Sequence, residues 1–460
     1  MQKLGQHFTD LFKRYMPDAF VFALILTFVV AFAAWSGTST SPVEILEAWY
    51  RGFWGLLEFG MQMTLLIVTG YAIALSPLID RQINVVATKI KHPTQVYLIV
   101  IYFGLFASLI SWGWVVIAAV LGRALAKKVA NINYPFLIAC AYLSKNIWST
   151  GLSSSIPLLL NTEGNYLIKA GLLETTIPSS STLGSPLNLG MIVLYLIVTP
   201  LLMLALRPRS ATGETLAELC LEDDKPLDNK PKQFTSYSTF SDRLNHSRLL
   251  VLGICLSGTV VVGNYFWEKG FDLNLNLMIF IFLLLGMALH QTPLHYGQAV
   301  QKASNNVSSI LYQFPFYAGI MGIMIHSGLA TQLASLLSAM ASVETLTSYA
   351  FVLGGLVNFA IPSGGGEFAV IGPSLLEAVQ VVGAALPEAE RYALQTRTIL
   401  ALTYGESLTN LLQPFFILMV LPIMAAGTKL QARDVMGYLV IPFVVLFFLQ
   451  LLLINLLPVS

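Results

Sequence analysis

Long apolar runs joined by short polar connections make up most of this chain. In the first half, apolar residues dominate positions 19–35, 56–75, 96–124, 134–160 and 189–206, and the second half adds similar runs from position 249 onward. A helix needs about 20 mostly apolar residues to cross the hydrocarbon core of a bilayer. The pattern therefore predicts an all-α polytopic membrane protein with about ten to eleven transmembrane helices.

Two of these runs contain residues that interrupt a helix. Residues 358–367 read NFAIPSGGGE, in which Pro362 lacks an amide hydrogen and three glycines remove the steric preference for a helix. Residues 111–114 read SWGW inside an apolar run too long for one span, which favours a span followed by a re-entrant hairpin with its tip at 111–113. Irregular backbone at membrane depth survives only where protein buries it or where it lines a polar cavity. Both breaks are therefore candidate binding sites, with a helix kink or a packing notch as the alternative.

Two further runs carry polar groups at their centres, which a lipid-facing helix would not do. Residues 141–151 read AYLSKNIWSTG, and residues 401–410 read ALTYGESLTN. Hydroxyl, amide and carboxylate oxygens are the ligands that hard cations accept. The candidate ion-coupling residues are Ser144, Asn146, Ser149, Thr150, Glu406, Ser407, Thr409 and Asn410, and sodium near Ser407 and Asn410 is one alternative.

Glu406 and Lys145 are the ionisable residues at the centres of these runs. An isolated carboxylate at membrane depth costs about 3 kcal/mol or more, so Glu406 should be protonated, paired, or next to a coupling cation. The alternative is an acid satisfied by local backbone at a helix break. Lys145 can pair with a carboxylate substrate or with an acid of a neighbouring helix, and the sequence leaves both interpretations open.

The two halves of the chain repeat one order of pieces: two spans, a span with broken backbone, a polar mid-span helix, and a further span. We therefore expect a first transmembrane repeat at 1–206, a charged cytoplasmic linker at 207–248, and a second repeat at 249–460. Internal repeats with broken helices are typical of secondary transporters, whose site lies near the bilayer midplane. Flanking charges favour an inverted repeat and the number of spans favours a parallel one, so this alternative stays open.

Composition excludes several other classes. The net charge of +1 provides no basic surface for nucleic acid, and the three cysteines are odd in number and scattered, which indicates free thiols. No glycine loop ends in Gly-Lys-Ser or Gly-Lys-Thr, and no ligand spacing indicates a firm metal site. Residues 151–155 read GLSSS, but no base accompanies them, so we expect neither an intramembrane hydrolase nor any other enzyme, and no cofactor beyond a coupling cation.

Several strings of residues resemble one transporter family. They are NFAIPSGGGEFAVIGP at 358–373, FWGLLEFGMQMTLLIVTG at 53–70, YPFLIACAY at 134–142, QFPFYAGI at 313–320 and YGESLTNLLQPFF at 404–416. Together they resemble the bacterial short-chain fatty acid transporter family, over nearly the whole chain except the charged linker. The family is similar in layout to an ion-transporter superfamily that pairs two re-entrant hairpins with two broken helices.

The resemblance implies a carrier of short carboxylates, such as acetoacetate or butyrate, driven by Na⁺ or H⁺ in the bacterial inner membrane. It also implies a homodimer and an elevator mechanism. The expected substrate-binding residues are Ser111, Trp112, Gly113, Asn358, Ser363, Gly364, Gly365, Gly366 and Tyr404, with the two tips holding the carboxylate and the aromatic rings closing the pocket. A superfamily sodium pattern of Ser, Asn and Thr is loosely mirrored by Ser144, Asn146 and Thr150, whereas Lys145 is not part of it. A carrier of dicarboxylates or other small anions and an anion channel are the rival interpretations.

Overall fold

The computed structural model describes residues 19–459, apart from 80, 83–84, 86–89, 209–210, 212, 221–238, 305–306, 360, 362, 413–416, 418–419 and 426. Within these residues the regular elements are helices, and the only extended pairing is an isolated bridge between Cys220 and Thr428. The all-α prediction is confirmed. Residues 1–18, Pro362 and the residues QPFF at 413–416 lie outside the described part of the chain.

Four helical segments of the described chain are long and apolar enough to cross a membrane: Pro42–Ala74, Pro93–Ile110, Pro186–Leu206 and Phe240–Lys269. A fifth is formed if Leu311–His326 and Leu329–Met340, which are bent by 74°, count as one span. Five more apolar helices are shorter than a full span: Ala23–Gly37, Trp112–Ala126, Leu275–His290, Leu346–Val357 and Val440–Leu456. These features indicate a multi-pass membrane protein, while the number of ten to eleven spans stays a prediction.

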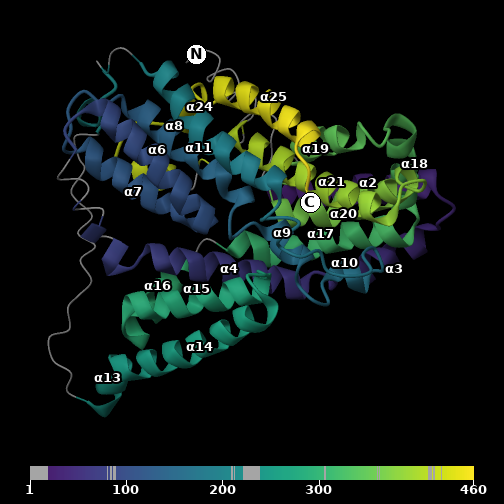
Figure 1. Cartoon of the computed structure of the whole chain (residues 1–460), viewed down its shortest axis with the longest axis horizontal. Coiled ribbons are helices and arrows are strands. Elements are labelled where there is room, and N and C mark those ends of the chain that lie inside the picture. Colours follow the sequence, from purple (N-terminus) through teal and green to yellow (C-terminus); the bar gives the residue numbers. More distant parts are fainter. Residues whose placement is uncertain are drawn as a thin grey trace.

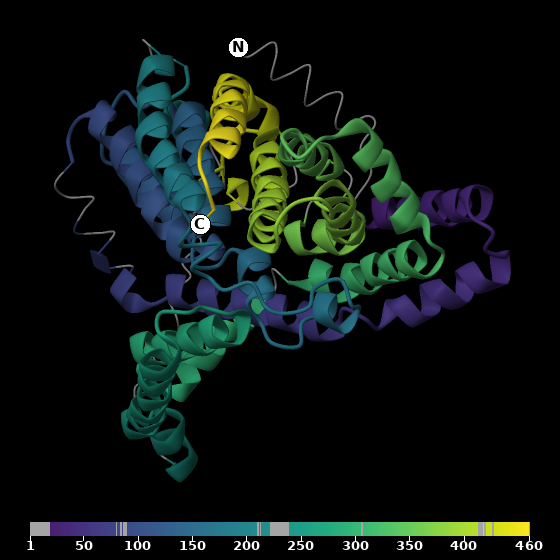
Figure 2. The same cartoon turned by 45° about the vertical axis from the view of Figure 1, so that its right-hand side comes forward.

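Helix α4 (Leu57–Ala74) runs through the middle of the molecule and separates two groups of helices. On one side α15 (Leu275–His290) and α16 (Pro293–Ser304) pack against it, and α14 (Arg248–Lys269) projects beyond them, as Figures 1 and 2 show. The interrupted helices lie on the other side, together with α11 (Pro186–Leu206) and α25 (Val440–Leu456). The candidate site therefore belongs to the larger group.

The first set of breaks follows the sequence closely. Helix α6 (Pro93–Ile110) ends at Ser111, the short 3-10 helix η1 (Trp112–Trp114) forms the tip, and α7 (Val115–Ala126) returns alongside α6. The hairpin is thus made by the span itself and α7, rather than by a separate hairpin after a span. The next helix, α8 (Tyr134–Ser144), tightens into the 3-10 helix η2 (Lys145–Thr150) and breaks before α9 (Ser155–Leu160).

The second set of breaks has the same order. Helix α19 (Leu346–Val357) ends where predicted, and α20 (Gly364–Val382) begins after Ser363, whose hydroxyl accepts a hydrogen bond from the Gly366 amide at 3.3 Å. Because Ser363 caps the helix, the glycines become its first turn. Helix α21 (Glu388–Thr409) then continues as the 3-10 helix η3 (Asn410–Leu412). The order of pieces is shared by both halves, and the symmetry that relates them stays a prediction.

Part of the charged linker is folded. Its residues 215–220 form α12 (Leu216–Leu219), and Leu216 and Leu219 are buried. The Leu219 carbonyl accepts a hydrogen bond from the Lys429 amide at 3.1 Å, and the Glu214 carbonyl accepts one from the Tyr134 amide at 2.8 Å. Acidic residues surround these two leucines in the sequence, so composition gives no sign of their burial.

Candidate substrate and ion site

The two interrupted helices meet where each of them tightens into a 3-10 turn. Ser407 on α21 donates a hydrogen bond to the Asn146 carbonyl on η2 at 3.2 Å, and the Tyr142 hydroxyl donates one to the Asn410 carbonyl. Carbonyls at such turns have lost their helical partners, so side chains from the opposite half of the chain donate hydrogen bonds to them. The structure therefore brings the two predicted polar segments together.

Asn358 joins the break after α19 to the end of α21. Its side-chain nitrogen lies 2.9 Å from the Glu406 carbonyl, 2.8 Å from the Thr409 hydroxyl and 2.8 Å from the Asn410 side-chain oxygen. Asn358 is fully buried. Its side-chain nitrogen acts as a brace between two elements, and its contact with substrate stays a prediction.

Three ionisable side chains form a buried cluster at this junction: Lys145, Glu367 and Glu406, each 1% exposed. The Glu406 carboxylate interacts electrostatically with both Lys145 and Glu367. Lys145 also lies over the Tyr142 ring, 5.1 Å from its centre. Lys145 thus interacts electrostatically with an acid of a neighbouring helix, and its pairing with a carboxylate substrate stays a prediction.

The start of α20 faces Glu406. A Cβ atom added at Gly364 would lie 3.1 Å from the Glu406 carboxylate, and the first amides of a helix attract negative charge. The glycine turn that the sequence predicts as an anion-binding site therefore already faces an anion of the protein. One Glu406 oxygen is 3.5 Å from the Asn410 side-chain nitrogen, and the other has no hydrogen-bond partner among the described residues.

Glu367 was not among the predicted site residues. Neither of its carboxylate oxygens has a hydrogen-bond partner within the described part of the chain, although the residue is buried. Burying a carboxylate without partners is expensive, so its presence demands a proton, a cation or a substrate group. The signal that could have identified it is a carboxylate directly after three glycines, at the start of a mainly apolar helix.

The oxygens available to an ion differ partly from the predicted set. Ser144 donates to Ala141, Thr150 to Ile147, and Thr409 to Glu406, each at a backbone carbonyl of its own helix. In contrast, the side-chain oxygens of Asn146 and Ser149 are buried and lack partners among the described residues. Residues three apart lie on one face of a 3-10 helix, so these two oxygens share the face of η2. The second Glu406 oxygen also lacks a hydrogen-bond partner among the described residues, and oxygens of this kind are ligands that a hard cation accepts.

A second layer of hydrogen bonds supports η2 from behind. Asn188 on α11 donates to the Thr150 carbonyl at 2.9 Å and accepts from the Tyr404 hydroxyl at 2.9 Å. The Tyr195 hydroxyl accepts from the Asn146 side chain at 2.8 Å and from Gln450 at 2.6 Å. Tyr404 is 1% exposed and its hydroxyl is occupied, so it braces this network. Asn188, Tyr195 and Gln450 are not among the predicted site residues, because they are scattered polar residues in the apolar helices α11 and α25.

The first tip, at Ser111, Trp112 and Gly113, lies against the C-terminal half of α4. The Trp112 amide donates to the Ser153 hydroxyl at 2.8 Å, and the Trp114 indole donates to the Gly70 carbonyl at 2.7 Å. Ser111 and Gly113 are buried and Trp112 is half-buried. The Ser153 hydroxyl thus serves to position the tip.

The second tip lies against the N-terminal half of α4, where a Cβ atom added at Gly365 would lie 2.7 Å from the Phe59 ring. A Cβ atom added at Gly366 would lie 2.7 Å from the ring of Tyr317, which belongs to α17 (Ser308–His326). Phe59 and Gly70 are separated by about 16 Å along the axis of α4 at 1.5 Å per residue. The two tips therefore contact α4 at points well separated along its axis, and their joint hold on one carboxylate stays a prediction. The glycines of the second tip serve mainly to admit aromatic rings.

Comparison with known proteins identifies the family. A family model described as "Short chain fatty acid transporter" matches residues 1–458. The chain belongs to the short-chain fatty acid transporter family. Curated relatives that carry this name provisionally are 34% identical over 443 residues in Haemophilus influenzae and 35% identical over 438 residues in Escherichia coli. These matches cover 95% of this chain in both cases, and 96% and 95% of the relatives.

Solved structures show that this family member shares a known transporter fold. The YdaH transporter of Alcanivorax borkumensis superposes with a TM-score of 0.59 at 16% identity, covering 96% of this chain and 98% of that one. MtrF of Neisseria gonorrhoeae, described with a class of antimetabolite efflux pumps, gives a TM-score of 0.53 at 13% identity, covering 96% and 95%. At these identities the likeness establishes the fold alone. The substrate of this family member has to be argued from its own site.

Proposed function

We propose that this family member takes up short-chain fatty acids such as acetoacetate or butyrate by symport with a cation. The observation that carries the proposal is the buried cluster of Lys145, Glu367 and Glu406 at the junction of the two interrupted helices. When all three side chains are ionised, one positive and two negative charges leave an excess negative charge. Arg397, the next cation along α21, lies about 14 Å from Glu406 along the helix axis, at 1.5 Å per residue.

An excess charge in an apolar surrounding favours uptake of a proton or a monovalent cation. A substrate carboxylate that enters the same region adds a second negative charge. Cation and substrate then bind more tightly together than separately, and this mutual dependence is what couples their movements. Glu406, Asn146 and Ser149 provide oxygens for Na⁺, and either carboxylate can hold H⁺, so both coupling ions are consistent with the proposal.

The substrate side of the proposal combines the family membership with apolar surroundings. Phe59, Phe314 and Tyr317 surround the glycines of the second tip, and rings of this kind accept a chain of a few carbons. Within the proposal the carrier is a homodimer in the bacterial inner membrane and moves by an elevator mechanism, as the layout of paired breaks suggests. Dicarboxylates or other small anions are the alternative cargo.

Competition and exchange experiments test this proposal. Purified protein in liposomes loaded with unlabelled butyrate should accumulate external labelled butyrate transiently, and succinate at the same concentration should compete weakly. Equal competition by succinate would favour a dicarboxylate carrier. Simple equilibration of label, without transient accumulation, would instead indicate an anion channel.

A further inference from the structure

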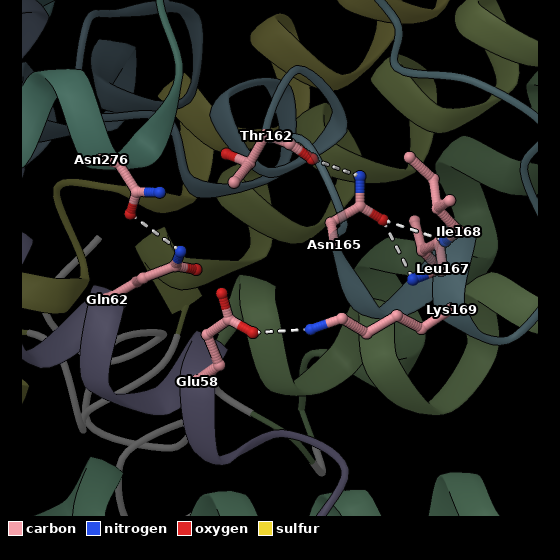
Figure 3. Close-up of polar contacts among 8 residues, drawn as sticks. All are labelled: Glu58, Gln62, Thr162, Asn165, Leu167, Ile168, Lys169 and Asn276. Atoms are coloured by element: carbon pink, nitrogen blue, oxygen red, sulfur yellow. Dashed lines mark hydrogen bonds and ion pairs between the residues drawn. The ribbon is translucent and has the colours of Figure 1, made fainter.

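A small cavity opens beside the first turns of α4, away from the buried carboxylate cluster. Its wall combines residues from the start of α4 with residues up to and including α10 (Tyr166–Lys169): Gly55, Glu58, Phe59, Gln62, Leu159, Thr162, Asn165, Tyr166 and Lys169. Figure 3 shows Glu58, Gln62, Thr162, Asn165 and Lys169 of this set. No predicted site residue lines it. The cavity is small, about 20 Å³, and its wall combines one cation, one carboxylate, a phenol and amide groups.

An ion pair spans this cavity. The Lys169 ammonium donates to the Glu58 carboxylate at 2.7 Å, and the two side chains are 60% and 62% exposed (Figure 3). Ion pairs at such exposure contribute little to stability. The pair therefore can open at low cost, and an incoming anion can replace Glu58 as the partner of Lys169.

The segment that carries Lys169 is held firmly. The Asn165 side-chain oxygen accepts hydrogen bonds from the Leu167 and Ile168 amides at 3.0 and 3.2 Å, which starts α10 (Figure 3). Tyr166 and Lys169 are three residues apart and share one face of this turn. Tyr166 is 7% exposed, and its hydroxyl has no hydrogen-bond partner among the described residues. A buried hydroxyl without a partner can donate a hydrogen bond to any acceptor that reaches it.

A single aromatic ring lies between the cavity and the second tip. Phe59 lines the cavity, its ring centre is 5.6 Å from that of Tyr166, and an added Cβ at Gly365 would lie 2.7 Å from the ring. Rotation of this ring would connect the cavity with the start of α20. The cavity therefore borders the region in which the proposed substrate is carried.

We propose that this cavity is a recruiting site for small carboxylate anions ahead of the buried site. Lys169 exchanges Glu58 for the anion, the Tyr166 hydroxyl donates a hydrogen bond to it, and Phe59 separates it from the second tip. The inference rests on the proposed function in taking the transported carboxylate as the ligand.

Opposite charge changes on the two partners of the ion pair test the proposal. Lys169→Gln removes the attracting charge and should raise the KM for butyrate uptake about fivefold at low ionic strength. Glu58→Gln removes the competing carboxylate and should lower KM by a similar factor. Both effects should shrink in about 0.5 M salt because exposed charges are screened. A merely structural ion pair would shift both variants in the same direction, and that result, or no shift in either, would overturn the proposal.

Lys269→Gln is the matched control. Lys269 forms a similar exposed pair with Glu163 at 3.7 Å, and neither residue lines the cavity. Its KM should stay unchanged, which separates a local effect from a change in overall charge. Tyr166→Phe should raise KM about twofold to fivefold without lowering thermal stability, since it removes a buried hydroxyl that has no partner. An unchanged KM in this variant would show that the Tyr166 hydroxyl does not bind the anion.

Chemical labelling separates failure of this inference from failure of the proposed function. In Glu58→Gln protein, butyrate should slow the reaction of Lys169 with a membrane-impermeant amine reagent, measured by mass spectrometry, and leave Lys269 unaffected. Protection without saturable uptake would support the site and contradict the transport proposal. Saturable uptake without protection would overturn the site alone.

Discussion

Replacing Glu406 by Gln should abolish cation-driven accumulation while leaving the protein folded. The substitution keeps the size of the side chain and removes one of the two buried carboxylates, so that Lys145 and Glu367 remain as a balanced pair. Because the group is 1% exposed, solvent does not screen its charge. A buried charge of this kind contributes about 3 kcal/mol to cation binding, which corresponds to a roughly hundredfold weaker activation by the coupling cation.

The assay is uptake of labelled butyrate into proteoliposomes against an imposed Na⁺ or H⁺ gradient, with the activation constant determined for each cation. Glu390→Gln is the matched control, because Glu390 lies in the first turn of the same helix and is exposed. We expect the control to accumulate butyrate like the unmodified protein. Uphill uptake by the Glu406→Gln protein with an unchanged activation constant would refute the role of the carboxylate.

Two further predictions concern packing and topology. Gly365→Ala should destabilise the protein by about 1–3 kcal/mol, because the added Cβ would lie 2.7 Å from the Phe59 ring, and the melting temperature in detergent should fall. Gly297→Ala is the control, since a Cβ added there would have no atom within 4 Å, and its melting temperature should not fall. Equal melting temperatures of the two variants would contradict this packing. Cys220 is exposed and Cys140 is buried. An impermeant maleimide should therefore label Cys220 from the cytoplasmic side only and leave Cys140 unlabelled in the folded protein. Labelling of Cys220 from outside would contradict the predicted location of the linker.

The positions of the interruptions were predictable from the sequence, since they depend on local chemistry. Ser111 ends α6, and α19 ends just before Asn358, at points where glycine, proline or a capping hydroxyl makes a continuous helix unfavourable. The polar character of residues 144–150 was equally informative, because polar groups inside an apolar run must face protein. Local rules of this kind need no knowledge of the remaining chain.

The partners of these groups were not predictable, because they depend on which helices pack together. That Glu406 rather than a ligand faces Gly364 follows from the packing of α20 on α21, and the separation of the two tips follows from the path of α4. Glu367 and Asn188 lie in mainly apolar helices, where the sequence offers no sign of the neighbour that makes them important.

All three free thiols were predicted from their odd number and scattered positions, and the structure confirms this. The folded part of the linker was missed for the opposite reason. Leu216 and Leu219 are only two apolar residues, and their burial depends on contact with distant segments near Tyr134 and Lys429. A short amphipathic turn of this kind is recognised only when its docking surface is known.

Counterflow under imposed gradients tests the central claim most directly. Liposomes that contain the purified protein are loaded with unlabelled butyrate and diluted into labelled butyrate, with a Na⁺ or an H⁺ gradient imposed separately and passive leak of the protonated acid subtracted. The account predicts transient accumulation of label that one of the two cations increases. Simple equilibration of label under every gradient would contradict a cation-coupled carrier.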